Sequence, residues 1–395
     1  MDIKALAEKY ESYIIDRRRF YHTCPEPSCE EKETRAKIHK DLEALGITEI
    51  TDMKDCYGLT AMIRGGKPGK TVALRADIDG LSVPEATGLP FASQNPGFMH
   101  ACGHDNHIAM LLGAAQILND VKDELCGNVK LIFQPAEEIA LGALNMMKEH
   151  VMDDVDAIYG AHIWGNFDAP LMDASEGNRM ACCHKFTINV EGMSSHASAP
   201  NLGVDAIAVS AAIINNLQQV VSRMNDPLNP LVLTIGTIQG GHRWNVTPGH
   251  VTMEGTVRTF LSGTAVEDTM RKIVATTAET FGATATLDDY IYMTLPVIND
   301  PKLSSIAQGA ITKLYGDASL AHLPTMMGSE DFSWFAEREG GNIPYVYAFI
   351  GSRNVEKGIT YTNHHEKYDV DESVLQRGAA VMAQFAADYL ADAAM

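Results

Sequence analysis

The sequence has no long hydrophobic run and no excess of positive charge. Nowhere in its 395 residues do about 18 apolar residues follow one another, so we expect no transmembrane helix. Lys and Arg number 31 against 51 Asp and Glu, which gives a formal net charge of −20. Phosphate backbones and anionic lipid repel such a chain, so we expect neither a nucleic-acid partner nor a membrane partner.

Cysteine and the best-known catalytic motifs are also scarce. Seven Cys, an odd number, fit a reducing compartment better than a disulfide framework, and residues 1–10 lack the apolar segment of a secretory signal. We therefore expect a cytoplasmic protein. G-x-S-x-G, H-E-x-x-H, the P-loop and G-x-G-x-x-G are all missing, so serine-hydrolase, zincin and nucleotide-binding interpretations lack their motifs.

What the chain does have is an alternation of apolar runs with amphipathic stretches. Apolar runs at 59–63, 71–75, 129–133 and 157–161 predict buried strands, and 108–118 and 141–150 predict helices between them. This pattern predicts an α/β fold, with a mostly parallel sheet covered by helices on both faces. A helix is expected over 3–20, and Ser28 with Glu31 has the capping-box spacing that predicts the start of a second.

The pattern changes near residue 185. Alternating or apolar strands at 185–191, 231–238, 250–259 and 284–292, with helices at 204–220 and 265–280, read β-α-β-β-α-β. That order predicts a ferredoxin-like α+β domain inserted into the larger one. We expect residues 1–184 and 296–395 to form the two parts of the larger domain and 185–295 to form the insertion.

Potential metal ligands follow the predicted strands of the larger domain. Open α/β sheets bind ligands at the carboxyl ends of their strands, so these side chains are expected to converge on one edge. They are Asp77 and Asp79 after one strand, Glu137 and Glu138 after the next, His162 after a third, and the loop Cys102-Gly103-His104-Asp105 before the 108–118 helix.

The Cys102 loop and the glutamate pair suggest different roles. Gly103 lets the backbone bend so that Cys102 and His104 can face one ion, and Asp105 can cap the next helix or support a ligating imidazole. A thiolate with imidazoles and carboxylates suits zinc, cobalt, nickel or manganese, not calcium. Glu137 and Glu138 are adjacent and must point differently, so one can hold a metal while the other moves a proton.

Several stretches resemble one known family. They are LRADID at 74–79, MHACGHD at 99–105, QPAEE at 134–138, GAH at 160–162, SHASAP at 195–200, NVTP at 245–248, GSEDF at 328–332 and NHH at 363–365. Through these stretches the chain is similar over nearly its whole length to the metal-dependent aminoacylases, and more narrowly to the branch of hippurate hydrolases, auxin-conjugate hydrolases and N-acetyl-diaminopimelate deacetylases.

The resemblance implies a dinuclear metal centre. It implies two divalent ions held by Cys102, His104, Glu138, His162 and His364, with Asp77, Asp79 and Asp105 supporting the ligands and Glu137 as general base and acid. We take His364 rather than His365 as the last ligand, because it stands four residues before Tyr368, where the family has its aromatic residue.

The resemblance also assigns residues to the inserted domain, which is a lid and dimerisation domain in this family. His196 would stabilise the oxyanion, commonly in the partner subunit's site, and Asn245 and Arg258 would contact substrate. A homodimer or higher homo-oligomer is implied. The expected reaction is hydrolysis of an N-acyl-L-amino acid, such as an N-acetyl or N-benzoyl derivative, by a metal-activated water.

Two other interpretations stay open at this point. A dipeptidase or carboxypeptidase would use the same metal chemistry on free peptides. A metal-binding or scaffold protein without catalysis could dispense with Glu137 and His196, yet both are present.

Overall fold

The chain folds into two compact units. The computed structural model describes residues 1–261, 263–337 and 341–394. The larger unit comprises Met1–Arg179, Ile298–Pro324 and Asp331–Met395, and the smaller comprises Met180–Val297 and Thr325–Glu330. The smaller unit thus begins five residues before the expected insertion and also takes in a short segment from later in the chain.

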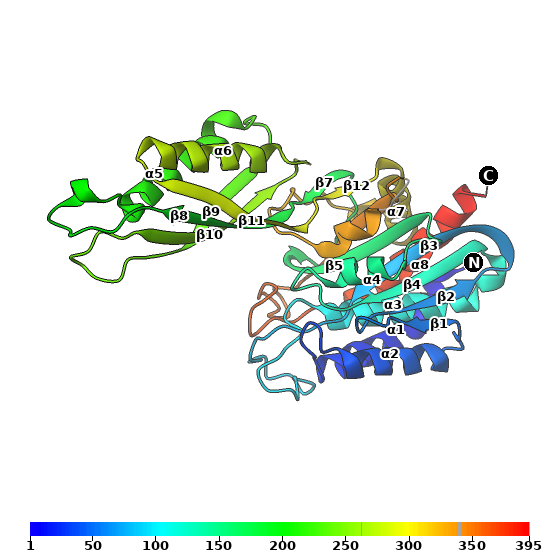
Figure 1. Cartoon of the computed structure of the whole chain (residues 1–395). Helices are drawn as coiled ribbons and strands as arrows, with labels where there is room; N and C mark the ends of the chain where they lie inside the picture. The colour runs from blue at the N-terminus through cyan, green and yellow to red at the C-terminus, as the bar shows by residue number, and fades with distance from the viewer. Residues whose placement is uncertain (262, 338–340, 395) are drawn as a thin grey trace. The chain divides into compact units, whose positions relative to one another are not determined.

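A seven-stranded sheet forms the centre of the larger unit (Figure 1). Strands β4, β3, β5 and β13 are parallel neighbours, and antiparallel strands flank them at both edges. The predicted α/β fold is confirmed. In sheet order the strands are β1 (Ile50–Asp52), β2 (Leu59–Arg64), β4 (Cys126–Gln134), β3 (Lys67–Asp77), β5 (Ala157–Asp168), β13 (Tyr345–Arg353) and β6 (Met172–Asp173).

The central strands are buried along most of their length because helices and loops cover both of their faces. The last seven residues of β3 and the first eight of β13 are buried. Helices α3 and α8 pack on β3, and α1 packs on both helices. The helices of this unit are α1 (Ile3–His22), α2 (Lys32–Ala44), α3 (His104–Asp120), α4 (Gly142–Lys148), α7 (Pro301–Tyr315) and α8 (Leu375–Asp392).

The smaller unit has the predicted β-α-β-β-α-β order. Its four antiparallel strands lie in the order β11-β8-β10-β9, and α5 and α6 pack on the sheet through one apolar core. Buried Phe186, Ile188 and Val190 alternate with more exposed residues along β8, as a strand with one covered face requires. The elements are β8 (Cys183–Glu191), α5 (Ala206–Gln219), β9 (Leu231–Gly240), β10 (His250–Thr259), α6 (Ala265–Thr280) and β11 (Thr284–Thr294). The remaining strands, β7 (Gly177–Met180) and β12 (Val297–Asn299), pair with each other.

The capping box predicted for the second helix is wrong. Helix α2 begins at Lys32, and its N-cap residue Glu31 makes no side-chain cap bond. Instead, the Ser28 hydroxyl donates to Asp79 (2.7 Å), and Glu31 Oε1 accepts from the backbone N–H of Ala136 (2.8 Å). Both side chains bind distant segments rather than the start of their own helix, a choice that local spacing cannot reveal.

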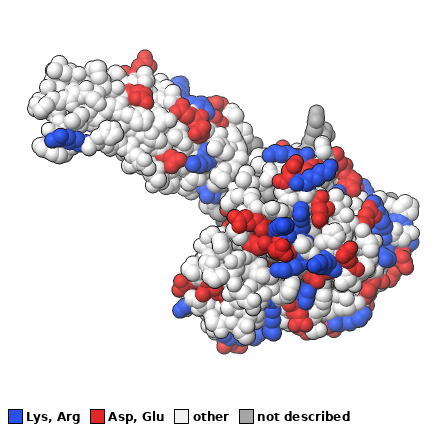
Figure 2. All heavy atoms as spheres, turned by 60° about the horizontal axis from the view of Figure 1, so that its bottom comes forward, with Lys and Arg blue, Asp and Glu red and all other residues white. Residues whose placement is uncertain are grey.

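Charges are mixed on the surface that Figure 2 shows. Acidic and basic side chains alternate over it, and no broad basic patch is visible on that face. Among the described helices, none combines the length and apolar character that crossing a bilayer requires.

Candidate metal centre

Five potential ligands from four separate segments meet in the larger unit. Cys102 Sγ lies 3.4 Å from His162 Nε2 and 3.3 Å from His364 Nε2. Glu138 Oε1 lies 3.8 Å from His104 Nε2 and 3.6 Å from His364 Nε2. The structure therefore brings together all five residues of the proposed ligand set.

Tight backbone turns place three of these ligands. Gly103 has φ 93°, and a Cβ there would lie 2.5 Å from a methyl carbon of Ile163, so only glycine fits between Cys102 and His104. His104 is the first residue of α3. His364 has φ 69°, and its backbone N–H donates to Ala101 O (2.7 Å), which fixes it against the Cys102 loop.

We had expected His162 to follow the end of a strand, but it lies within strand β5. Strand β5 continues to Asp168, but its pairing with β3 stops at Gly160, opposite Arg75. Beyond that point β5 pairs on one side only, with β13, where Phe349 is the partner of His162. His162 thus lies just past the last pair with β3, and its side chain meets residues that follow the ends of the other strands.

Hydrogen bonds to the outer ring nitrogens fix two of the imidazoles. His104 Nδ1–H donates to Asp79 O (2.8 Å) and lies 3.1 Å from Asp79 Oδ1, and His162 Nδ1–H donates to Ile163 O (2.7 Å). In each ring the lone pair is then on Nε2, the atom that faces the cluster. Asp79 also accepts the backbone N–H of Glu138 (3.1 Å), so one carboxylate orients two ligands.

Asp77 lies close to the cluster, whereas Asp105 faces away from it. Asp77 Oδ2 is 3.8 Å from His104 Nε2. Asp105 neither caps α3, whose N-cap is Gly103, nor bonds a ligating imidazole. It accepts from Arg18 Nε (3.0 Å) and pairs with His22 Nδ1 (2.8 Å), because these two side chains of α1 are buried against it.

The donor set fits divalent cations. His104 Nε2 and Glu138 Oε1 are buried and have no hydrogen-bond partner among the described residues. Burial raises the pKa of Glu138 to about 7, and burial together with the Glu138 carboxylate raises the pKa of the Cys102 thiol well above its ordinary value. Burying unpaired polar atoms and like charges together costs free energy of folding when no cation is bound. A bound cation supplies a partner for these atoms and favours the charged forms of Glu138 and Cys102.

Glu137 lies beside this cluster. A carboxylate oxygen of Glu137, a ring nitrogen of His104 and a carboxylate oxygen of Glu138 all lie within 4.8 Å of one another. Ala136 just before it adopts φ 51°, a left-handed turn that sets the direction of the glutamate pair. Both carboxylates thus lie near the cluster, at the sheet edge where residues that follow β4 were expected.

His365 makes its contacts elsewhere. Its ring stacks on Tyr361, with centroids 4.3 Å apart, and its Nδ1 accepts the backbone N–H of Lys367 (3.0 Å). This geometry favours His364 as the histidine of the cluster.

In the smaller unit, His196 and Asn245 are neighbours. His196 forms a β-bridge with Val246, and the backbone N–H of Ala197 donates to Asn245 O (3.2 Å). The Ser198 N–H donates to His196 Nδ1 (3.1 Å), so the neutral ring carries its proton on the exposed Nε2 side. Arg258 lies on β10 and donates to Ser329 Oγ (2.8 Å).

Sequence reasoning missed two residues that hold the centre. His107 Nδ1–H donates to Asp77 Oδ1 (2.5 Å), and its Nε2 accepts the Ile163 N–H (2.9 Å). Asn363 Nδ2 donates to Cys102 O (2.9 Å) and Ile163 O (3.2 Å). The position of His107, three residues after His104 and so on the same helix face, was a usable signal. Asn363 lies in the NHH stretch directly before His364, but nothing in the sequence indicated that its side chain would bind the Cys102 loop.

Comparison with known proteins identifies the family. The model of peptidase family M20/M25/M40 matches residues 73–388. The chain is 36% identical over 393 residues to thermostable carboxypeptidase 1 of Saccharolobus solfataricus, covering 98% of each. It is 37% identical over 386 residues to N-acetylcysteine deacetylase of Bacillus subtilis, covering 96% of this chain and 98% of the relative.

A solved structure agrees with this assignment. A Bacillus subtilis protein described as a dinuclear metal-binding peptidase of the M20 family matches with a TM-score of 0.85 and 35% identity, covering 97% of this chain and 99% of the other. The chain belongs to the M20/M25/M40 peptidase family, which confirms the resemblance to the aminoacylases. It is a metal-dependent hydrolase that acts on amides.

The two adjacent histidines provide a test of the cluster. We expect His364→Ala to lower bound metal, because it removes a ring nitrogen 3.3 Å from Cys102 Sγ and 3.6 Å from Glu138 Oε1. His365→Ala removes a neighbouring ring that contacts Tyr361 and should retain full metal content. Elemental analysis after dialysis measures both. Equal metal content in the two variants would exclude His364 as a ligand.

Proposed function

We propose that this protein hydrolyses the amide bond of N-acyl-L-amino acids, releasing a carboxylate and a free amino acid. The observation that carries the proposal is the cluster of Cys102, His104, Glu138, His162 and His364, of which Cys102, His104 and His162 are buried, with Glu137 beside it. The relative named N-acetylcysteine deacetylase supports this substrate class over an unrelated amide.

Five side chains would hold two divalent ions, and zinc, manganese, nickel and cobalt all suit their chemistry. When bound, these ions polarise the amide carbonyl and make a nucleophilic water available at neutral pH. The ligands from this chain are Cys102, His104, Glu138, His162 and His364, with Asp77 and Asp79 supporting them.

Glu137 moves the proton in this proposal. It takes a proton from the attacking water and later delivers it to the leaving nitrogen, so that the amine departs neutral. His196 donates from Nε2 to the oxyanion that forms on the former carbonyl oxygen, a contribution of roughly 3–4 kcal/mol for one such donor. Asn245 and Arg258 of the smaller unit would contact the substrate.

We further propose that the protein is a cytoplasmic homodimer or higher homo-oligomer. Strand β9 is an edge of the smaller sheet, and Val232 and Ile238 on it are exposed. An exposed edge with apolar side chains favours pairing with a second copy. The smaller unit, residues 185–295 in the sequence-based division, would then serve as the lid and dimerisation domain.

A substrate panel tests the reaction class. We expect N-acetyl and N-benzoyl amino acids to be cleaved with higher kcat/KM than dipeptides by the metal-loaded protein, as measured by release of the free amino acid. The relative named as a carboxypeptidase makes peptide hydrolysis the second candidate. Faster cleavage of dipeptides, or of longer peptides from their carboxyl end, would replace the aminoacylase assignment with that one.

The adjacent glutamates should separate metal binding from proton transfer. We expect Glu137→Gln to keep its metal and lose roughly 10²–10⁴-fold in kcat, because only the proton-transfer group is removed. Glu138→Gln should lose metal, since it replaces a buried carboxylate oxygen of the cluster with a neutral amide. Elemental analysis and steady-state kinetics on both variants measure this. Full activity in Glu137→Gln would remove that residue from the mechanism.

A further inference from the structure

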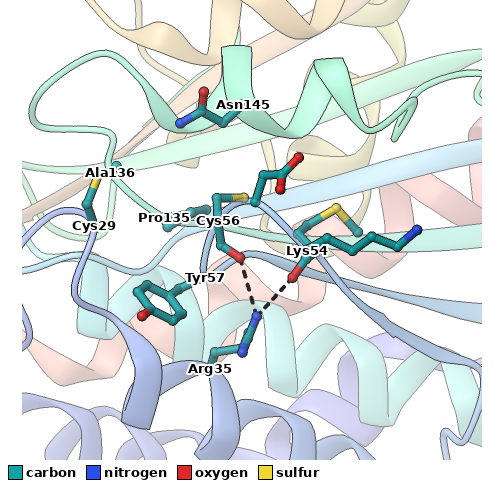
Figure 3. Close-up of a pocket in the computed structure, with 10 residues that line it drawn as sticks. Cys29, Arg35, Lys54, Cys56, Tyr57, Pro135, Ala136 and Asn145 are labelled. Atoms are coloured by element: carbon teal, nitrogen blue, oxygen red, sulfur yellow. Dashed lines mark hydrogen bonds between the residues drawn. The ribbon is translucent and has the colours of Figure 1, made fainter.

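Glu31 is a buried glutamate that binds the loop carrying Glu137 and has no role in the proposed reaction. Glu31 is fully buried, and its Oε1 accepts the backbone N–H of Ala136 (2.8 Å) and of Cys29 (3.0 Å). Cys29 and Ala136 are more than one hundred positions apart in the chain, yet Figure 3 shows them side by side. Burial raises the pKa of Glu31 to about 7, which means that the protein environment disfavours the charged form of this carboxyl group.

Ala136 needs this support because its backbone is strained. It adopts φ 51°, a region that residues other than Gly, Asn and Asp rarely occupy. Its carbonyl accepts the N–H groups of Leu141 (3.2 Å) and Gly142 (3.1 Å), and its own N–H is held by Glu31. Such a conformation persists only where the surroundings determine it, and here hydrogen bonds fix both sides of the residue.

A pocket borders the loop on the side of the Glu31 hydrogen bond. Pro135 and Ala136 line a pocket of about 270 Å³, together with Cys29 and Cys56 (Figure 3). Ala136 is nevertheless only 1% exposed, so packing and the hydrogen bond hold this part of the loop together. The Glu31 carboxylate is thus a direct tie between this part of the loop and the neighbouring segment.

The same segment also ties the residue that follows Glu137. The Ser28 hydroxyl donates to Asp79 Oδ2 (2.7 Å), and Asp79 Oδ2 accepts the backbone N–H of Glu138 (3.1 Å). Residues 28–31 therefore bind the chain on both sides of Glu137. They bind Ala136 directly through Glu31, and they bind Glu138 indirectly, through the Asp79 carboxylate.

We propose that Glu31 is a positioning residue that holds Glu137 in the geometry required for proton transfer. The proposal rests on the function assigned to Glu137 above. It gives Glu31 no contact with substrate or metal. Its effect passes through the Ala136 N–H and the left-handed turn.

Substitution of Glu31 should lower turnover selectively. We expect Glu31→Ala to reduce kcat by about 100-fold, the loss that a displacement of roughly 1 Å can cause, with KM and metal content within about twofold of the parent. Glu31→Gln keeps an oxygen that can accept both N–H groups, so it should restore kcat to within a few-fold. Kinetics and elemental analysis are measured below the melting temperature of each variant.

Glu26 offers a matched control in the same segment. Its carboxylate accepts the N–H groups of Glu33 (3.2 Å) and Thr34 (2.6 Å) and the Thr34 hydroxyl (2.7 Å), all at the start of α2. Glu26→Ala therefore removes comparable hydrogen bonds without touching the loop. We expect it to lower thermal stability and leave kcat unchanged.

Clear outcomes would overturn the inference. These are an unchanged kcat in Glu31→Ala, a loss that follows KM or metal content, or an equal loss of kcat in Glu26→Ala. If Glu31→Ala does not fold, Glu31→Asp replaces it, because a side chain shorter by one methylene keeps the charge but draws the acceptor away, and kcat should again fall. Glu137→Gln is assayed in parallel: its full activity would refute the role assigned to Glu137, on which this inference rests, whereas its inactivity beside an unaffected Glu31 series would refute only this inference.

Discussion

The larger unit holds a group of buried atoms with the chemistry of metal ligands, and the protein alone does not satisfy them. His104 Nε2 and Glu138 Oε1 lack hydrogen-bond partners among the described residues, and the Cys102 thiol lies against two imidazoles. Burial works against the charged forms of both Glu138 and Cys102. A fold retains such a cluster at a cost in stability, and cation binding is the interaction that offsets the cost.

The topology of the sheet explains how distant segments supply one centre. Strands β4, β3 and β5 are parallel neighbours, so the residues after β4 and β3 emerge at the same edge, and the one-sided pairing of β5 frees His162 at that level. Backbone groups as well as side chains orient the proposed ligands. Asp79 O, Ile163 O and the Glu138 N–H each fix the direction of a ligand. The proposed ligands are thus held in place by the protein itself, and such preorganisation favours affinity for an ion.

Much of this could be predicted from the sequence because the signals were local. Apolar runs identified the central strands, and Cys102-Gly103-His104 marked a turn with two ligands. The features that were missed depend on tertiary contacts. Ser28 and Glu31 have capping-box spacing, but they bind Asp79 and Ala136 instead. Asp105 stands near the start of helix α3, yet its carboxylate forms hydrogen bonds with buried Arg18 and His22. A spacing rule cannot decide between a local partner and a distant one when both are sterically possible.

X-ray absorption spectroscopy at the zinc edge of the zinc-reconstituted protein tests the metal centre most directly. The account predicts a sulfur scatterer at about 2.3 Å beside nitrogen and oxygen neighbours, with the sulfur lost in Cys102→Ser. A spectrum with only nitrogen and oxygen neighbours in the parent protein would contradict it, because Cys102 would then not be a ligand and the cluster would not be the metal site.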